Sequence, residues 1–386
     1  MPHALYLPQR IRIGSGSITE IGQLAVEIGA RRPMIITDAF MLSSGLVDRV
    51  RSRLEAAGLR VHVFSDTVPD PTTDALDLGL RAVHDHEADV LIGLGGGSSI
   101  DTAKALALLA KSGGSMRDYK APRVNADAAL PVIAVPTTAG SGSEATQFTI
   151  ITDTDNDEKM LCQGPSFMPV AALIDADLTV SMPPRLTADT GIDALTHAIE
   201  AYVSRKANPF SDGLAVNAMS TIGLCLDRAY SDGEDISARE AMMLAALQAG
   251  IAFSNSSIGL VHGMSRPIGA HFRVAHGLSN AMLLPAVTAF SLAGAPRKYA
   301  DCARALGVSS PDDSDEVAGA NLVAALEEYA FRLDVPTPEK YGISRSDWHR
   351  LTPLMAEQAL ASGSPDNNPV IPTASQIRDL YERIYA

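Results

Sequence analysis

Cysteine is scarce in this 386-residue chain, which contains three: Cys162, Cys225 and Cys302. Their number is odd, they lie far apart in the sequence, and none forms a CxxC pair. The sequence therefore favours neither a disulfide framework nor a thiolate metal site. Because a reducing compartment suits such a cysteine content, we expect a cytoplasmic protein.

The sequence also lacks the signals of export, membrane insertion and nucleic-acid binding. No basic segment followed by an apolar one opens it, and no run reaches about 18 uninterrupted apolar residues. Lys and Arg number 31 against 45 Asp and Glu, which gives a formal net charge of −14. Such a charge repels a phosphate backbone, and no basic run offsets it. We therefore expect neither a membrane nor a nucleic acid as a partner.

What the chain does contain is typical of a globular protein. Hydrophobic residues make up 46% and charged residues 20%, and the length suits two domains better than one. In the first half, short β-branched segments alternate with amphipathic helical stretches; these segments span residues 33–38, 60–66, 88–97 and 130–138. The alternation predicts an α/β domain with a mostly parallel, doubly wound sheet.

The pattern changes after residue 182. Strand-like segments almost vanish, and helical segments rich in Ala, Leu and Met, such as 239–255, take over. Pro183 and Pro184 mark the change, since two prolines interrupt both helices and sheet ladders. We predict an α/β domain over residues 1–182 and an all-helical domain over 183–386. The segment 5–16 is expected to form a hairpin used in subunit contact.

A glycine-rich loop follows the predicted strand at 88–97. Gly95, Gly96 and Gly97 end this strand, and Ser98 and Asp101 open the next helix. Glycines let the backbone approach a pyrophosphate closely, and a helix N-terminus offers free N–H groups to it. The loop matches neither the GxGxxG fingerprint nor the P-loop, so a simple strand-to-helix turn stays an alternative.

Polar residues also follow the neighbouring predicted strands. Thr137, Thr138 and Ser141 come at the end of one strand, and Asp38 ends another. In a doubly wound sheet the ligand lies across the carboxyl ends of the strands. Asp38 suits a ribose diol and repels a 2′-phosphate, which favours NAD over NADP; it is equally suited to capping the helix that follows.

Histidines gather between residues 259 and 281, in a segment nearly free of acids. Upstream, Asp193 and His197 are four residues apart and share one helix face, although such a pair alone is more often structural. With His262 and His276 they make one carboxylate and three imidazoles. This set suits iron or zinc and leaves a coordination position for a substrate oxygen.

Four motifs occur in the order GGGSSIDTAK, PTTAGSGSEAT, GIDALTHAIEAYVS and LVHGMSRPIGAHFRVAHGLSNAMLLP. Together they resemble the iron-containing, or group III, alcohol dehydrogenase family over nearly the whole chain. The resemblance implies a Rossmann-like N-terminal domain and a helical C-terminal domain, with substrate and metal in the cleft between them. The implied metal is Fe²⁺, with Zn²⁺ as the alternative, and its ligands are Asp193, His197, His262 and His276. The implied NAD site consists of Asp38, the loop Gly95 to Ser98, Asp101, Thr137, Thr138, Ser141, Lys159 and Leu178. The resemblance also places the PDP sequence at 69–71 near the adenine ribose.

In such a site the metal acts as a Lewis acid toward the alcohol oxygen, and hydride passes to the nicotinamide. We interpret His271 as a proton relay or as a residue that orients the ligands. Arg266 stands one turn after His262, where many family members carry a histidine. A permanent cation is no general base, but it suits a carboxylate, phosphonate or sulfonate. We therefore predict a short alcohol or aldehyde substrate with an anionic tail; an ion pair between Arg266 and a nearby acid is the alternative.

Other enzymes stay open as alternatives. Maleylacetate reductases and glycerol dehydrogenases share this architecture, and so does dehydroquinate synthase, a lyase. The lyase needs more basic residues than Lys104, Lys159 and Arg266 provide. A non-catalytic nucleotide-binding module has no use for the metal set. Because the family often assembles, we expect a homodimer or a larger homo-oligomer.

Overall fold

Two structural units share the chain, one of Met1–Ser181 and one of Met182–Ala386. They are seen in a computed structural model, which describes residues 4–156 and 158–386. The division falls one residue before the predicted boundary between 182 and 183. Each unit is built on different secondary structure, as the change of sequence pattern predicts.

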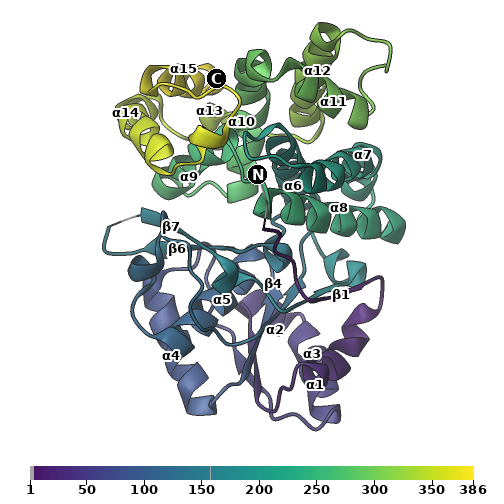
Figure 1. Cartoon of the computed structure of the whole chain (residues 1–386), viewed down its shortest axis with the longest axis vertical. Coiled ribbons are helices and arrows are strands. Elements are labelled where there is room, and N and C mark those ends of the chain that lie inside the picture. Colours follow the sequence, from purple (N-terminus) through teal and green to yellow (C-terminus); the bar gives the residue numbers. More distant parts are fainter. Residues whose placement is uncertain (1–3, 157) are drawn as a thin grey trace. The chain divides into compact units, whose positions relative to one another are not determined.

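A six-stranded parallel sheet forms the centre of the first unit (Figure 1), with the strand order β1-β8-β5-β4-β2-β3. Its strands are Arg10–Ile13 (β1), Pro33–Ile36 (β2), His62–Phe64 (β3), Val90–Gly95 (β4), Val132–Pro136 (β5) and Ala171–Ile174 (β8). Every pairing in this sheet is parallel. The predicted doubly wound α/β fold is therefore confirmed.

Helices cover both faces of this sheet because its strands bury side chains on both sides. Along β2, Ile35 belongs to one apolar cluster with Leu24 and Val50, whereas Met34 belongs to a second cluster with Leu106. The alternation follows from the two-residue period of a strand. The helices of this unit are Ile21–Glu27 (α1), Ala39–Ser43 (α2), Leu46–Ala56 (α3), Thr73–His86 (α4) and Gly97–Ser112 (α5).

The N-terminal segment does not form the predicted hairpin. Arg10–Ile13 is the edge strand β1, which pairs in parallel with β8. The prediction was wrong because alternation along one strand does not reveal its partner, which here lies far along the chain. The sequence pattern also did not predict β8 or an antiparallel pair, Phe148–Asp153 (β6) with Glu158–Gln163 (β7).

The second unit is helical. Residues 182–386, all of which the structure describes, contain helices and no strand, so the predicted all-α domain is confirmed. Pro184 is the first residue of the first of these helices, a position where the missing N–H of proline costs nothing. The helices are Pro184–Val203 (α6), Pro209–Ser231 (α7), Ile236–Ser254 (α8), Leu260–Phe272 (α9), His276–Ser291 (α10), Pro296–Ala305 (α11), Asp315–Arg332 (α12), Pro338–Tyr341 (α13), Arg345–Ala361 (α14) and Ala374–Ile384 (α15).

The stretch His276–Gly294, which is α10 with the turn after it, is long and apolar enough to span a membrane by length and composition. It is the one such stretch among the residues described, and 61% of its 18-residue apolar window is buried inside the protein. The helix packs against α6, α9 and α12. Its apolar composition is that of a core helix of this unit.

Candidate functional site

The four residues predicted as metal ligands come together in the second unit, from three different helices. Asp193 and His197 lie on α6, His262 lies in the first turn of α9, and His276 is the first residue of α10. One ligand atom from each residue lies within 4.8 Å of those of the other three. His276 is half-buried and the other three are buried.

The Asp193 carboxylate is the common neighbour of the three imidazoles. Its Oδ1 lies 3.8 Å from Nε2 of His197, 3.6 Å from Nε2 of His262 and 3.8 Å from Nε2 of His276. Burial raises the pKa of Asp193, but the imidazoles outweigh burial, and the pKa lies well below its usual range. The carboxylate is thus ionised at neutral pH, as a metal ligand must be.

Local sequence explains how α10 reaches this group. Residue 277 is glycine, and a Cβ atom there would lie only 2.5 Å from the carbonyl oxygen of Asp189 on α6. A larger residue would push the two helices apart. Gly277 therefore lets α10 begin against α6, which places His276 beside Asp193.

Asn280 also reaches the group, although the sequence motifs did not predict it there. Its Nδ2 lies 2.7 Å from Asp193 Oδ1 and 3.2 Å from Nε2 of both His262 and His276. Three acceptor-type atoms thus converge around one position, which is the arrangement that a divalent cation requires. With His197, the group offers one carboxylate and three imidazoles, a donor set that fits iron or zinc. Asn280 follows His276 at a spacing of four, so helical spacing alone would have found it.

Glu200 is the second residue that the sequence analysis missed. It is 4% exposed, and its Oε2 lies 2.6 Å from Nδ1 of His262. Burial lowers the pKa of His262, but Glu200 and Asp193 outweigh burial and raise it. Glu200 stands three residues after His197 on the helix that carries Asp193, and residues three apart also share a helix face, so helical spacing would have included it.

Arg266 is buried one turn after His262, with 7% of its surface exposed. Its guanidinium donates to Oγ of Ser364 at 3.0 Å, and its Nε has no hydrogen-bond partner. Among the residues described no carboxylate oxygen forms an ion pair with it within 4.0 Å, although the charge of Glu200 acts on it. The alternative of an arginine paired with a nearby acid is therefore not seen as a direct contact. Burial lowers the pKa of Arg266 to about 10, opposed by the charge of Glu200, and the group stays charged at neutral pH.

His271 lies apart from the four-residue metal group. It stands in the last turn of α9, is half-buried, and its Nε2 lies 2.8 Å from Oε1 of Gln358. Its function as a proton relay stays a prediction.

The glycine-rich loop of the first unit lies where the strand order reverses. The chain leaves β2 for the sheet edge at β3 and leaves β4 toward β5, so the carboxyl ends of β2 and β4 flank the point that favours ligand binding. Gly95 ends β4 with φ of +146°, and a Cβ atom there would lie 2.5 Å from Ser99 Oγ and 3.6 Å from Asp38 Oδ2. The other oxygen of Asp38 accepts the N–H of Met41 at 2.9 Å and caps α2, while Thr137 donates its N–H to Gly95.

The polar residues after β5 face the same loop. A Cβ atom on Gly96 would lie 3.7 Å from the Thr138 side chain, and one on Gly97 would lie 3.1 Å from Ser141 Oγ. The structure therefore brings together the loop and the ends of three strands, as predicted. Their function in cofactor binding stays a prediction.

Lys159 is tied to the loop through the PDP sequence. Its Nζ lies 2.9 Å from Oδ2 of Asp70, whose backbone N–H donates to Ser98 Oγ at 3.3 Å. Asp70 adopts a φ of 51° in this turn. The turn thus connects β7 with the start of α5.

Two further residues predicted for the cofactor site have contacts within the unit. Asp101 accepts the N–H of Ile150 at 3.0 Å and lies 3.9 Å from Nζ of Lys104, so its carboxylate faces β6. Leu178 is 6% exposed and belongs to the apolar cluster of one sheet face. The function of Asp101 and Leu178 in cofactor binding stays a prediction.

Glu144, buried in the segment after β5, should make stability depend on pH. Burial raises its pKa from 4.5 to about 7, partly opposed by its own backbone N–H and by Lys104. As the pH rises from 4.5 to 7, the Glu144 carboxyl ionises in the unfolded chain but stays protonated in the folded protein. The free energy of unfolding therefore falls over this range. We expect Glu144→Gln to remove this fall. Its free energy of unfolding should rise relative to that of wild type by about 1–3 kcal/mol between pH 5 and pH 8.

Urea unfolding at several pH values measures this difference. Glu55→Gln, at an exposed position of α3, serves as the control and should follow wild type at every pH. Parallel curves for Glu144→Gln and wild type would contradict the prediction.

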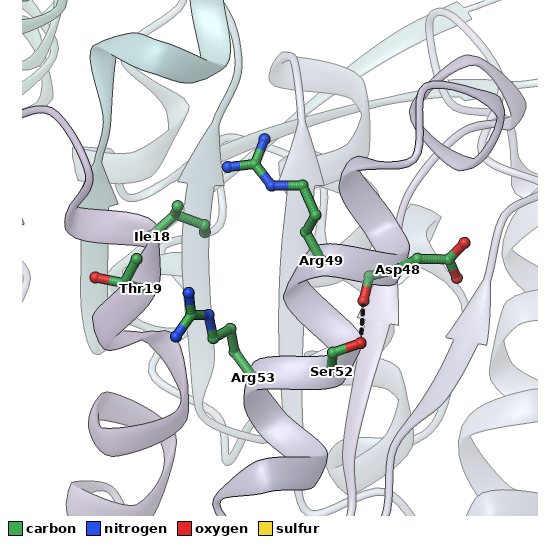
Figure 2. A pocket seen from close by; sticks show the side chains of 6 residues that line it. All are labelled: Ile18, Thr19, Asp48, Arg49, Ser52 and Arg53. Atoms are coloured by element: carbon green, nitrogen blue, oxygen red, sulfur yellow. Dashed lines mark hydrogen bonds between the residues drawn. The ribbon is translucent and has the colours of Figure 1, made fainter.

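A pocket of about 370 Å³ lies elsewhere in the first unit, between α3 and the short turn Ser17–Glu20. Figure 2 shows its six lining residues, with Arg53 extending from α3 toward Thr19. None of the predicted site residues lines it. The predicted chemistry therefore rests on the metal group and the glycine-rich loop.

Comparison with known proteins gives the same match for both units. Residues 8–176 match the family described as iron-containing alcohol dehydrogenase, and residues 187–385 match the C-terminal part of the Fe-containing alcohol dehydrogenase family. The NAD-dependent methanol dehydrogenase of Bacillus methanolicus is 37% identical over 97% of this chain and 98% of its own.

Two solved structures superpose on the whole of this chain. A 1,3-propanediol oxidoreductase superposes with a TM-score of 0.95 at 30% identity and covers all of both chains. The sulfoacetaldehyde reductase of Bifidobacterium kashiwanohense, solved with NAD⁺, superposes with a TM-score of 0.89 at 26% identity over 100% of this chain and 99% of its own.

Proposed function

Because this chain belongs to the iron-containing alcohol dehydrogenase family and is an oxidoreductase that acts on alcohols, we propose that it interconverts a short primary alcohol and its aldehyde with NAD(H) and a divalent metal. The observation that carries this proposal is the convergence of Asp193, His197, His262 and His276. In this proposal the first unit binds the dinucleotide, and the second unit binds the metal and the substrate.

The four converging residues hold the ion in this proposal, Fe²⁺ first and Zn²⁺ second, because imidazole and carboxylate ligands accept either. A divalent ion bound there supplies Lewis acidity toward the alcohol oxygen. The chain contributes an ionised Asp193 and three Nε2 atoms that face it. His271 is the proposed proton relay.

The dinucleotide is proposed to bind at the glycine-rich loop, and it supplies the acceptor for hydride. One oxygen of Asp38 caps α2, and the other, near Gly95, is left for a ribose diol. A carboxylate at this position favours NAD over NADP. The loop N–H groups at the start of α5 suit a pyrophosphate.

The substrate is proposed to carry a carboxylate, phosphonate or sulfonate tail. Arg266 is a buried cation with a free Nε donor and a hydroxyl, not an acid, as its partner. A guanidinium with spare donors recognises such groups through paired hydrogen bonds. One structural neighbour is, by its name, a reductase of an aldehyde with a sulfonate.

The oligomeric state and the cellular compartment of the enzyme are proposed as well. We propose a homodimer or a larger homo-oligomer in the cytoplasm, in keeping with three free, buried cysteines and with the family's habit of assembly.

The test is the consumption of NADH by protein purified without oxygen and stripped of metal. We expect oxidation of NADH only after Fe²⁺ or Zn²⁺ is added, and only with short aldehydes. Dihydroxyacetone and maleylacetate test the two alternative reductases by the same measurement. The lyase consumes no NADH, so release of phosphate from the phosphorylated substrate of dehydroquinate synthase in the presence of NAD⁺ tests it. The proposal would be contradicted if the protein converted one of these substrates and no aldehyde, or if it converted aldehydes equally well without metal.

Lys159→Ala should weaken NADH binding about tenfold, because one charge-assisted hydrogen bond to the cofactor is lost. Fluorescence titration with NADH measures this affinity without turnover. Lys120→Ala is the matched control, because Lys120 forms an ion pair with Glu158, the residue next to Lys159 on β7. An unchanged affinity in Lys159→Ala, or an equal loss in Lys120→Ala, would remove Lys159 from the proposed site.

A further inference from the structure

The buried carboxylate of Glu200 contacts one proposed metal ligand and the start of the helix that carries it. Its Oε2 lies 2.6 Å from Nδ1 of His262 and accepts the N–H of Gly259 at 2.9 Å. Its Oε1 accepts the N–H of Val261 at 2.6 Å. Both oxygens therefore face donors from one short segment, 259–262.

This contact decides which nitrogen of His262 is available to a metal. An imidazole that donates Nδ1–H to a carboxylate keeps the lone pair on Nε2. Nε2 is the atom that lies 3.6 Å from Asp193 Oδ1, inside the metal group. The second oxygen of Glu200 holds the first turn of α9, so it also holds the backbone from which this ring projects.

We propose that Glu200 is a positioning residue for metal binding: it selects the tautomer of His262 and fixes the direction of its ring without coordinating the ion itself. The inference rests on the proposed metal site. A carboxylate in this position also makes the imidazole a stronger ligand, and removing such a partner usually costs 10- to 100-fold in metal affinity.

A buried carboxylate can instead serve structure alone, and the chain offers a matched example. Asp175 in the first unit is fully buried and accepts the N–H groups of Gly16, Ile18 and Asp177 at 2.8–3.1 Å. Its described contacts include no histidine. Asp175→Asn therefore reports what the loss of a buried backbone-capping carboxylate does to this protein by itself.

The experiment measures the affinity of the full-length, metal-free protein for Zn²⁺ in competition with a chromogenic chelator, together with its free energy of unfolding. We expect Glu200→Gln to bind Zn²⁺ 10- to 100-fold more weakly, because an amide nitrogen repels the N–H groups around it. Glu200→Asp keeps the charge and should recover part of the loss. Asp175→Asn should lower stability and leave the Zn²⁺ affinity at the wild-type value.

Wild-type affinity in Glu200→Gln with reduced stability would overturn the inference, since Glu200 would then be a structural cap. An equal loss of affinity in Asp175→Asn would overturn it too. If Glu200→Gln does not fold, the ¹⁵N NMR shifts of the His262 ring in the metal-free wild-type protein decide, and a proton on Nε2 in place of Nδ1 overturns the inference. His262→Ala separates the two proposals: if it binds Zn²⁺ like wild type, the metal site itself is wrong and the inference fails with it.

Discussion

His262→Ala should lose its bound metal and lower kcat/KM for the preferred aldehyde by at least about a thousandfold, which corresponds to roughly 4 kcal/mol of transition-state stabilisation. The expectation follows from the position of this residue. Its Nε2 faces Asp193, its Nδ1 faces Glu200, and its ring stacks on His197 with centroids 4.6 Å apart. Alanine removes one of the four proposed ligands and leaves Asp193, His197 and His276 to hold the ion.

Metal content after anaerobic loading with Fe²⁺, together with steady-state kinetics, measures the effect. His271→Ala is the control for metal content, because His271 belongs to the same helix but contacts Gln358. It should keep the metal whatever happens to its turnover. A His262→Ala protein that retains both metal and turnover would contradict the assignment of the ligand set.

Arg266→Ala should lower kcat/KM for anionic aldehydes about 100-fold and for uncharged aldehydes much less. A hydrogen bond to a charged group contributes about 1.5–3 kcal/mol, which converts to roughly 10- to 150-fold in kcat/KM. Arg266 is 7% exposed, so its charge acts where water screens poorly. Uncharged substrates lack the group that the guanidinium recognises.

Kinetics with matched pairs of short aldehydes, with and without a carboxylate or sulfonate tail, measures this selectivity. Arg239→Ala is the control for the loss of a buried arginine, because Arg239 is 2% exposed and donates to Gly233, Thr187 and Met182. It should not discriminate between the two substrate classes. An equal loss on both classes in Arg266→Ala would sink the proposal of an anionic tail.

Much of the fold follows from local patterns. The alternation of β-branched and amphipathic segments predicts the strands at 33–38 and 88–97, and β2 and β4 occur within them. The prediction of a hairpin at residues 5–16 was wrong because the same strand pattern fits either an antiparallel neighbour or a distant parallel one. The pairing of β1 with β8 depends on which edge of the sheet is free, and no local pattern encodes that.

Spacing along one helix by itself determined the parts of the site that lie on one helix. Residues four apart share a face, which pairs Asp193 with His197 and would have added Asn280 to His276. Only the tertiary structure decided that α6, α9 and α10 meet, since this depends on close packing at positions such as Gly277. The same packing put Glu200 against the His262 ring and placed the Ser364 hydroxyl beside the Arg266 guanidinium. Contacts between distant segments arise from how side chains fill a shared core, and periodicity within a segment carries no information about them.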